Sequence, residues 1–313
     1  MVQSSAELRR FADADTLART IAGEIAVRLT RACADRGRAA LVVSGGRSPV
    51  RLFEELRRQP LDWSRLFITL ADERWLDASA AASNERLVRE ALLRGKAAAA
   101  RFVGLKNPAS SARIGAATSW EALASVPRPF DVTLLGMGDD GHTASLFPGS
   151  PGLGEALEAS VPAGCVAMWS RSAPHERVSL NMSALLESRH ISILILGEEK
   201  LAVYERARSP GPAEEMPVRG ILRQSRVPVQ VIWAPAKSAG CDLVVPAPNR
   251  TEPPTDSQAK CAPVEAGRLL KIVDVDVSEE LHEGCRSRRE WRANFAHGPG
   301  PRRSLGHIAR SRD

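Results

Sequence analysis

The chain has 313 residues, of which 43% are hydrophobic and 26% are charged, and this balance is typical of a globular protein with a large core. The formal net charge of +6 favours an anionic substrate or partner. The five cysteines form no CxxC pair, and no apolar run approaches the roughly 18–20 residues of a membrane span. We therefore expect a cytoplasmic protein with no disulfide framework, no metal site and no membrane contact.

The first predicted element is a long helix over residues 13–36. Its apolar residues recur every four positions, which places them on one face: Leu17, Ile21, Ile25, Leu29 and Cys33. A short apolar strand in "AALVVSGG" follows, and helical spacing resumes in "SPVRLFEELRR". We expect Ser48 to cap this second helix and Pro49 to occupy its first position.

The same order of strand, loop and helix returns three times along the chain. "LFITLADERW" precedes "SNERLVREALLRG", "FDVTLLGMGDDGH" precedes "TASLF", and "HISILILGEEK" precedes "LAVYERA". Shorter strand candidates are "CVAMWS", "RVSL" and "VPVQVIWAP". Nearly continuous apolar strands that alternate with helices predict an α/β fold, with a mostly parallel sheet and helices on both faces.

The character of the chain changes after Pro235. Residues 236–313 are rich in proline and arginine, and they contain a single apolar run, "LLKIVDVDV". Such a composition buries too little apolar surface to offset the entropy of ordering it. We therefore predict one domain over residues 1–235 and a poorly ordered C-terminal extension over residues 236–313.

Chemically reactive residues follow each of the four strong strands. In open α/β sheets, ligands bind outside the carboxyl ends of the strands. The four loops are Ser44-Gly45-Gly46, Asp72-Glu73-Arg74, Gly136 to His142, and Gly197 to Lys200. Glycines let backbone N–H groups approach an anion, so the first loop suits a phosphate, although an ordinary tight turn also fits it.

The charged residues in these loops can either bind a substrate or form ordinary surface ion pairs. Asp72 and Arg74 are two residues apart, so in an extended segment their side chains point to the same side. Arg74 can then grip a phosphate or lactone oxygen while Asp72 orients it, or the two can form a surface ion pair of little energetic value. Arg177 and Lys200 carry the same two alternatives.

The loop "GMGDDGHTASLFPG" contains one histidine, His142. We expect a helix to begin directly after it, at Thr143. A histidine at this edge of a sheet can act as a general base, with Asp139 or Asp140 orienting the ring. A capping or packing role is the alternative, and the residue types do not decide between the two.

Taken in order, "SGGRSP", "ADERW" with "SNERL", "GMGDDGHTASLFPG", "RVSLNMSALL" and "GEEK" resemble the 6-phosphogluconolactonases of the glucosamine-6-phosphate isomerase/6-phosphogluconolactonase superfamily. The resemblance runs from the first helix to "VIWAP". It implies a Rossmann-like α/β domain that hydrolyses 6-phospho-D-glucono-1,5-lactone to 6-phosphogluconate, in the oxidative pentose phosphate pathway, without metal or cofactor.

The resemblance also implies roles for particular residues. His142 matches the general base that activates water, and we group Asp140 with it as catalytic. The matching motifs supply the expected substrate-binding residues: Ser44, Gly45, Gly46, Asp72, Arg74, Gly138, Thr143, Arg177 and Lys200.

Two other functions remain open at this point. One is a related sugar-phosphate enzyme, such as a glucosamine-6-phosphate deaminase. The other is a sugar-phosphate-sensing regulator without catalysis, which needs a DNA-binding module such as a helix-turn-helix. Only one convincing helix precedes the first strong strand, and the basic segment 286–312 lacks the pattern of a known module, so we expect no specific nucleic-acid partner.

Overall fold

The computed structural model describes residues 6–170 and 174–236. The predicted C-terminal extension lies outside these residues from position 237 onward. Its poor order and the domain boundary near residue 235 therefore stay predictions. Within the described ranges, no helix is both long enough and apolar enough to cross a membrane.

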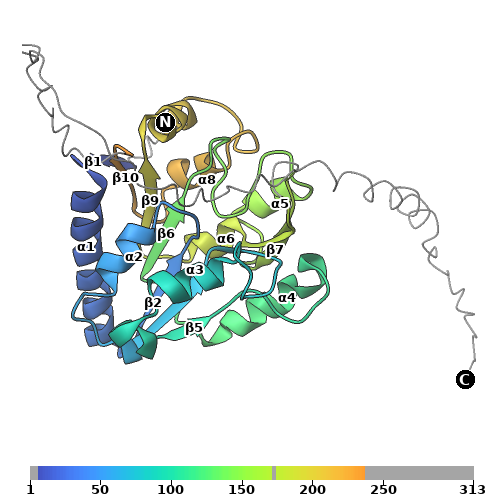
Figure 1. Ribbon diagram of the computed structural model, residues 1–313. Coiled ribbons are helices and arrows are strands. Elements are labelled where there is room, and N and C mark those ends of the chain that lie inside the picture. Colours follow the sequence, from blue (N-terminus) through green and yellow to red (C-terminus); the bar gives the residue numbers. More distant parts are fainter. Residues whose placement is uncertain (1–5, 171–173, 237–313) are drawn as a thin grey trace, which may run out of the picture. The chain divides into compact units, whose positions relative to one another are not determined.

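A seven-stranded sheet, parallel throughout, forms the centre of the described chain (Figure 1). In spatial order its strands are β1 (Glu7–Arg10), β10 (Val229–Ala234), β9 (Ile191–Leu196), β6 (Val132–Gly136), β2 (Ala39–Val43), β3 (Leu66–Leu70) and β5 (Arg101–Val103). Every residue of β2 and β3 is buried, as their nearly continuous apolar sequences predict for strands covered on both faces.

Helices cover both faces of this sheet. They are α1 (Ala14–Arg36), α2 (Val50–Leu56), α3 (Asn84–Ala91), α4 (Ala112–Ala122), α5 (Leu153–Leu157), α6 (Met182–Leu186), α7 (Glu198–Arg208) and α8 (Val218–Arg223). α1 packs on β2, β6 and β10 and against α2, whereas α6 lies on the opposite side of the sheet (Figure 1). The predicted α/β fold is confirmed.

The ends of α1 explain why the predicted helix forms where it does. The carboxylate of Asp13 accepts a hydrogen bond from the backbone N–H of Thr16, at 2.6 Å, and thereby caps the N-terminus. At the other end Gly37 adopts a φ of 77° and donates its N–H to the carbonyl of Cys33. Such a left-handed cap favours glycine and stops the helix.

The predicted cap of α2 is wrong. Pro49 occupies the capping position with helical backbone angles, and α2 begins at Val50. The hydroxyl of Ser48 makes no hydrogen bond to the first turn, because the helix starts one residue later than the serine-proline pattern predicts.

Two features were not predicted from the sequence. The strand β1 pairs with β10 and closes one edge of the sheet, although its polar sequence "ELRR" shows no apolar alternation. A second, antiparallel sheet contains β4 (Asp72–Arg74), β8 (Arg177–Leu180) and β7 (Cys165–Met168).

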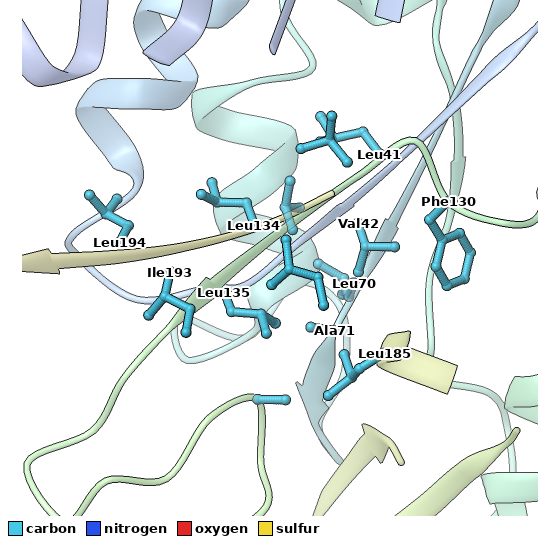
Figure 2. Close-up of a cluster of buried hydrophobic side chains, with 14 of the residues drawn as sticks. Leu41, Val42, Leu70, Ala71, Phe130, Leu134, Leu135, Leu185, Ile193 and Leu194 are labelled. Atoms are coloured by element: carbon cyan, nitrogen blue, oxygen red, sulfur yellow. The ribbon is translucent and has the colours of Figure 1, made fainter. Parts of the chain in front are cut away.

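One residue, Ala71, joins the two sheets. It separates β3 from β4, its N–H donates to the carbonyl of Val43 in the central sheet, and its carbonyl accepts from the N–H of Leu180 in the small sheet; both bonds measure 2.9 Å. The side chains around it are buried (Figure 2). The chain therefore passes from one sheet into the other with no flexible connection.

The order of the strands places a crevice between β2 and β6. From β2 the chain proceeds outward through β3 to β5, and from β6 it proceeds the other way through β9 to β10. Ligands of open α/β sheets bind at this reversal, outside the carboxyl ends of the strands. The N–H of Ser44, just after β2, donates to the carbonyl of Leu134 in β6 at 3.0 Å and joins the two strands at this point.

His190, just before β9, provides a test of acid stability. The imidazole is 7% exposed, and burial, with Arg28 adding to it, lowers its pKa from 6.5 to about 4. Between these values the unfolded chain binds the proton and the folded chain does not, so the free energy of unfolding falls as the pH falls. The contribution amounts to about 3 kcal/mol from pH 6.5 to pH 4.

We expect a His190→Gln variant to lose this part of the pH dependence. Urea unfolding of both proteins at several pH values measures it. A constant difference in unfolding free energy between wild type and variant across this range would contradict the prediction.

Candidate active site

A cleft of about 460 Å³ lies at the carboxyl ends of the central strands, where the loops after β2, β4, β6 and β9 meet. Nine of the eleven predicted site residues line it: Ser44, Gly45, Gly46, Asp72, Arg74, Gly138, His142, Arg177 and Lys200. The other two, Asp140 and Thr143, do not line it.

His142 is held by one of the two neighbouring aspartates. Its Nδ1 lies 2.6 Å from Oδ1 of Asp140, and its backbone N–H donates to the same oxygen at 3.0 Å. Burial alone would raise the pKa of Asp140, but the hydrogen bonds and the charge interaction with His142 together outweigh it, and the pKa lies below its ordinary value. Asp139 instead pairs with Lys200, whose Nζ lies 2.7 Å from Oδ1. The two aspartates thus have different partners.

The glycines before His142 permit this arrangement. The N–H of Gly138 donates to the carbonyl of His142 at 2.8 Å, and Gly141 turns the chain with a φ of 79°. A Cβ at position 138 would lie 2.1 Å from Nδ1 of His142 and 2.7 Å from Oδ1 of Asp140. Because no such contact is tolerated, only glycine at position 138 lets the imidazole and carboxylate meet here.

The helix predicted to follow His142 does not form. Thr143 and Leu146 form an isolated β-bridge across a tight turn, in which Ala144 has a φ of 49°. This left-handed conformation is incompatible with a helix. Thr143 is fully buried and donates its hydroxyl to the carbonyl of Gly136, so its side chain closes the loop and does not face the cleft.

The turn brings Phe147 back against the histidine. The ring centroids of Phe147 and His142 are 4.4 Å apart, with a 50° angle between the planes. The guanidinium carbon of Arg177 lies 5.8 Å from the centroid of the same phenyl ring. The imidazole and the guanidinium therefore both contact one aromatic side chain.

Arg74 and Arg177 are directly opposite each other in the small sheet. Within the described residues neither guanidinium forms an ion pair, and the Nε of each is buried without a hydrogen-bond partner. Burial, together with the nearby charge of Arg74, lowers the pKa of Arg177. Like charges at opposed positions of a sheet destabilise it. An anion bound in the cleft would satisfy both groups.

The motif "DER" divides into three separate roles. The carboxylate of Asp72 accepts from the hydroxyl of Ser145 at 2.6 Å and makes no ion pair with Arg74, contrary to the predicted pairing. Arg74 donates to the carbonyl of Ala82 instead. Glu73 is buried, which raises its pKa, and it accepts from the first backbone N–H groups of α3.

The glycine loop after β2 is held by Asn84. The amide of Asn84 donates to the carbonyl of Asp72 at 2.8 Å, and a Cβ at position 45 would lie 1.8 Å from its oxygen. Gly46 has a φ of 94°, and the buried hydroxyl of Ser44 has no hydrogen-bond partner in the described part of the chain. The glycines here serve close packing and a left-handed turn, which leaves the loop backbone beside the cleft.

Sequence reasoning missed four residues of this region: Arg47, Asn84, Ser145 and Phe147, all of which line the cleft. Each stands inside one of the sequence motifs quoted above, but a side chain of these types does not by itself indicate a functional site. Their importance comes from contacts between loops distant in sequence. Within the described chain, no group of three or more His, Cys, Asp and Glu side chains could hold a metal ion.

The fold and the cleft define an α/β enzyme whose site, at the strand reversal, combines a histidine–aspartate pair with two facing guanidinium groups. Residues 12–233 match the family described as glucosamine-6-phosphate isomerases/6-phosphogluconolactonase, and the chain belongs to this family.

Named relatives agree with this assignment. The 6-phosphogluconolactonase of Pseudomonas aeruginosa is 47% identical over 73% of this chain and 94% of its own length. That of Rhizobium meliloti is 41% identical over 74% of this chain and its own full length. The crystal structure of a 6-phosphogluconolactonase from Shewanella baltica is 48% identical, with a TM-score of 0.70 over 72% of this chain and 97% of that one.

The arginine pair yields a prediction that combines stability with binding. We expect Arg177→Met to raise the Tm by about 2–4 °C in phosphate-free buffer, because it removes a buried charge beside Arg74. The same substitution should abolish the rise in Tm that inorganic phosphate causes in the wild type.

Differential scanning calorimetry with and without phosphate measures both effects. Arg113→Met, on the exposed side of α4, is the matched control and should keep the wild-type response to phosphate. A lower Tm with an unchanged phosphate response in Arg177→Met would contradict the proposed anion site.

Proposed function

We propose that this protein is a 6-phosphogluconolactonase, which hydrolyses 6-phospho-D-glucono-1,5-lactone to 6-phosphogluconate in the oxidative pentose phosphate pathway. One observation carries the proposal: a histidine with an aspartate partner shares its cleft with two guanidinium groups that have no carboxylate partner among residues 6–170 and 174–236. The names of the similar proteins support the same reaction.

The charges of the cleft suit a phosphorylated substrate. Four cations line it, Arg47, Arg74, Arg177 and Lys200, against two carboxylates, Asp72 and Asp139. The excess of two positive charges balances a phosphate dianion. We assign the phosphate to Arg74, Arg177 and Lys200 together with the Ser44 to Gly46 loop, whose backbone lies at the same cleft. Binding of this remote group positions the lactone ring for reaction.

His142 acts as the general base. Because its Nδ1 faces the carboxylate of Asp140, the proton resides on Nδ1 and the lone pair of Nε2 is free. Nε2 takes a proton from water as the water oxygen bonds to the lactone carbonyl carbon. The resulting tetrahedral intermediate expels the ring oxygen, which receives the proton back from Nε2, so the base is regenerated.

The alternative functions have less support. The three relatives described above are named as lactonases, and no observation in the cleft favours amine release from glucosamine 6-phosphate. A sensor without catalysis would not need the aspartate that fixes the orientation and tautomer of His142. We place the reaction in the cytoplasm, because a phosphorylated sugar does not cross a membrane unaided.

A lactonase assay corrected for spontaneous hydrolysis tests the function. We expect the wild type to release acid from the lactone and no ammonia from glucosamine 6-phosphate. His142→Ala should lower kcat by about 10²–10⁴-fold, the range that loss of a general base causes. Turnover near the wild-type value in His142→Ala would refute the assigned base, and ammonia release by the wild type would favour the deaminase.

Gly138→Ala tests the geometry behind the base. The added methyl group would occupy the place of the imidazole, so His142 must turn away from Asp140. We expect kcat to fall by about 10²-fold, as a displacement of about 1 Å in a reacting group can cause. Gly154→Ala, in α5 with open space around the position, is the matched control and should keep wild-type kcat. Equal kcat values for the two alanine variants would disprove the steric argument.

A further inference from the structure

The five residues after His142 connect it to the small sheet. The left-handed Ala144 reverses the chain, and the N–H of Leu146 donates to the carbonyl of Thr143 at 3.0 Å. As a result, Ser145 and Phe147 both lie against residues of the small sheet. A non-glycine residue in this conformation is uncommon and costs free energy, and such positions concentrate at functional sites.

Ser145 is bound to two strands of the small sheet. Its hydroxyl donates to Oδ2 of Asp72 in β4 at 2.6 Å, and its N–H donates to the hydroxyl of Ser179 in β8 at 3.2 Å. All three residues are buried, and Asp72 and Ser179 are directly opposite each other in the sheet. A hydrogen bond to a buried carboxylate is among the stronger polar contacts in a protein. It therefore locates the turn relative to the strands that carry the arginines.

Phe147 makes the second connection. It is 5% exposed, and its ring contacts His142 at a centroid distance of 4.4 Å and the guanidinium of Arg177 at 5.8 Å. The backbone of Arg177 is fixed in β8, so the guanidinium gives the aromatic ring a fixed surface to pack against. The ring also sets how closely the imidazole and the guanidinium can approach each other.

We propose that Ser145 and Phe147 are positioning residues, which hold His142 at a fixed distance and angle from the Arg74–Arg177 pair. This inference rests on the proposed function, because it assigns the two residues to the alignment of the base with a substrate anchored by its phosphate. Neither residue supplies a group that reacts. Both act through His142 and the small sheet.

The geometry predicts a particular kinetic result. The two arginines and Lys200 stand on β4, β8 and α7, so they keep their places when the turn after His142 shifts. Anchoring of the phosphate should then persist while the imidazole moves away from the attacking water. Loss of alignment at a reacting group lowers kcat, whereas retained binding leaves KM almost unchanged.

The experiment compares Ser145→Ala and Phe147→Leu with matched controls in the core. Ser119→Ala removes a buried hydroxyl that donates to the carbonyl of Leu105 at 2.5 Å, and Phe130→Leu truncates a fully buried phenyl ring (Figure 2). None of the control positions lines the cleft. We expect kcat of the two test variants to fall about 10–100-fold. Their KM and their Kd for inorganic phosphate should stay within about threefold of wild type.

Other kinetic results would overturn the proposal. Losses of kcat in the controls that match those in the test variants would mean that general destabilisation is responsible. A Kd for phosphate that rises in parallel with the fall in kcat would mean that the residues serve the anion site itself. Wild-type kcat in both test variants would exclude any positioning role.

A measurement that does not depend on enzymatic turnover tests the positioning role separately from the proposed function. NMR of ¹⁵N-histidine-labelled protein follows the imidazole of His142, identified by the signal missing from His142→Ala. We expect saturating phosphate to shift this signal in wild type and to shift it less in Ser145→Ala and Phe147→Leu. Absent lactonase activity in wild type would refute the function alone. A wild-type shift in both variants would refute the positioning role alone.

Discussion

The opposition of Arg74 and Arg177 across β4 and β8 is the constraint on which the site depends. Two guanidinium groups at facing positions, one of them 9% exposed, repel each other, and within the described residues the Nε of each lacks a hydrogen bond that would offset its desolvation. Favourable interactions elsewhere in the fold must offset this repulsion and keep the two groups together. The buried parallel sheet does so, and the arrangement is preorganised for an anion before any anion arrives.

The neighbouring aspartates show how one loop separates two tasks. Asp140 fixes the orientation and tautomer of His142, whereas Asp139 neutralises and directs Lys200. Adjacent residues face different partners because the glycine-rich backbone turns sharply between the strand and the histidine. The imidazole and the ammonium group are thus held independently, although both aspartates lie in one short segment beside the cleft. A single carboxylate could not hold both groups.

The sequence predicted the central sheet well, since buried parallel strands are nearly continuous apolar runs and α1 repeats its apolar residues every four positions. Nine of the eleven residues predicted for the site line the cleft, because strand ends converge in such sheets. The prediction failed where the outcome depends on contacts between distant segments. The helix expected after His142 is replaced by a turn at Ala144, and the side chain of Thr143 faces inward. Which aspartate holds the histidine is likewise decided by backbone geometry that residue types do not encode.

The connection through Ala71 limits how this site can change during evolution. Side chains alternate between the two faces of a strand. One residue inserted between β3 and β4 would therefore move Asp72 and Arg74 to the face that Glu73 now occupies, and Glu73 to theirs. The carboxylate that caps α3 would enter the cleft and the guanidinium would leave it. New substrate preferences must therefore arise through replaced side chains or through the outer loops. The length of this segment is as restricted as the identity of any residue in it.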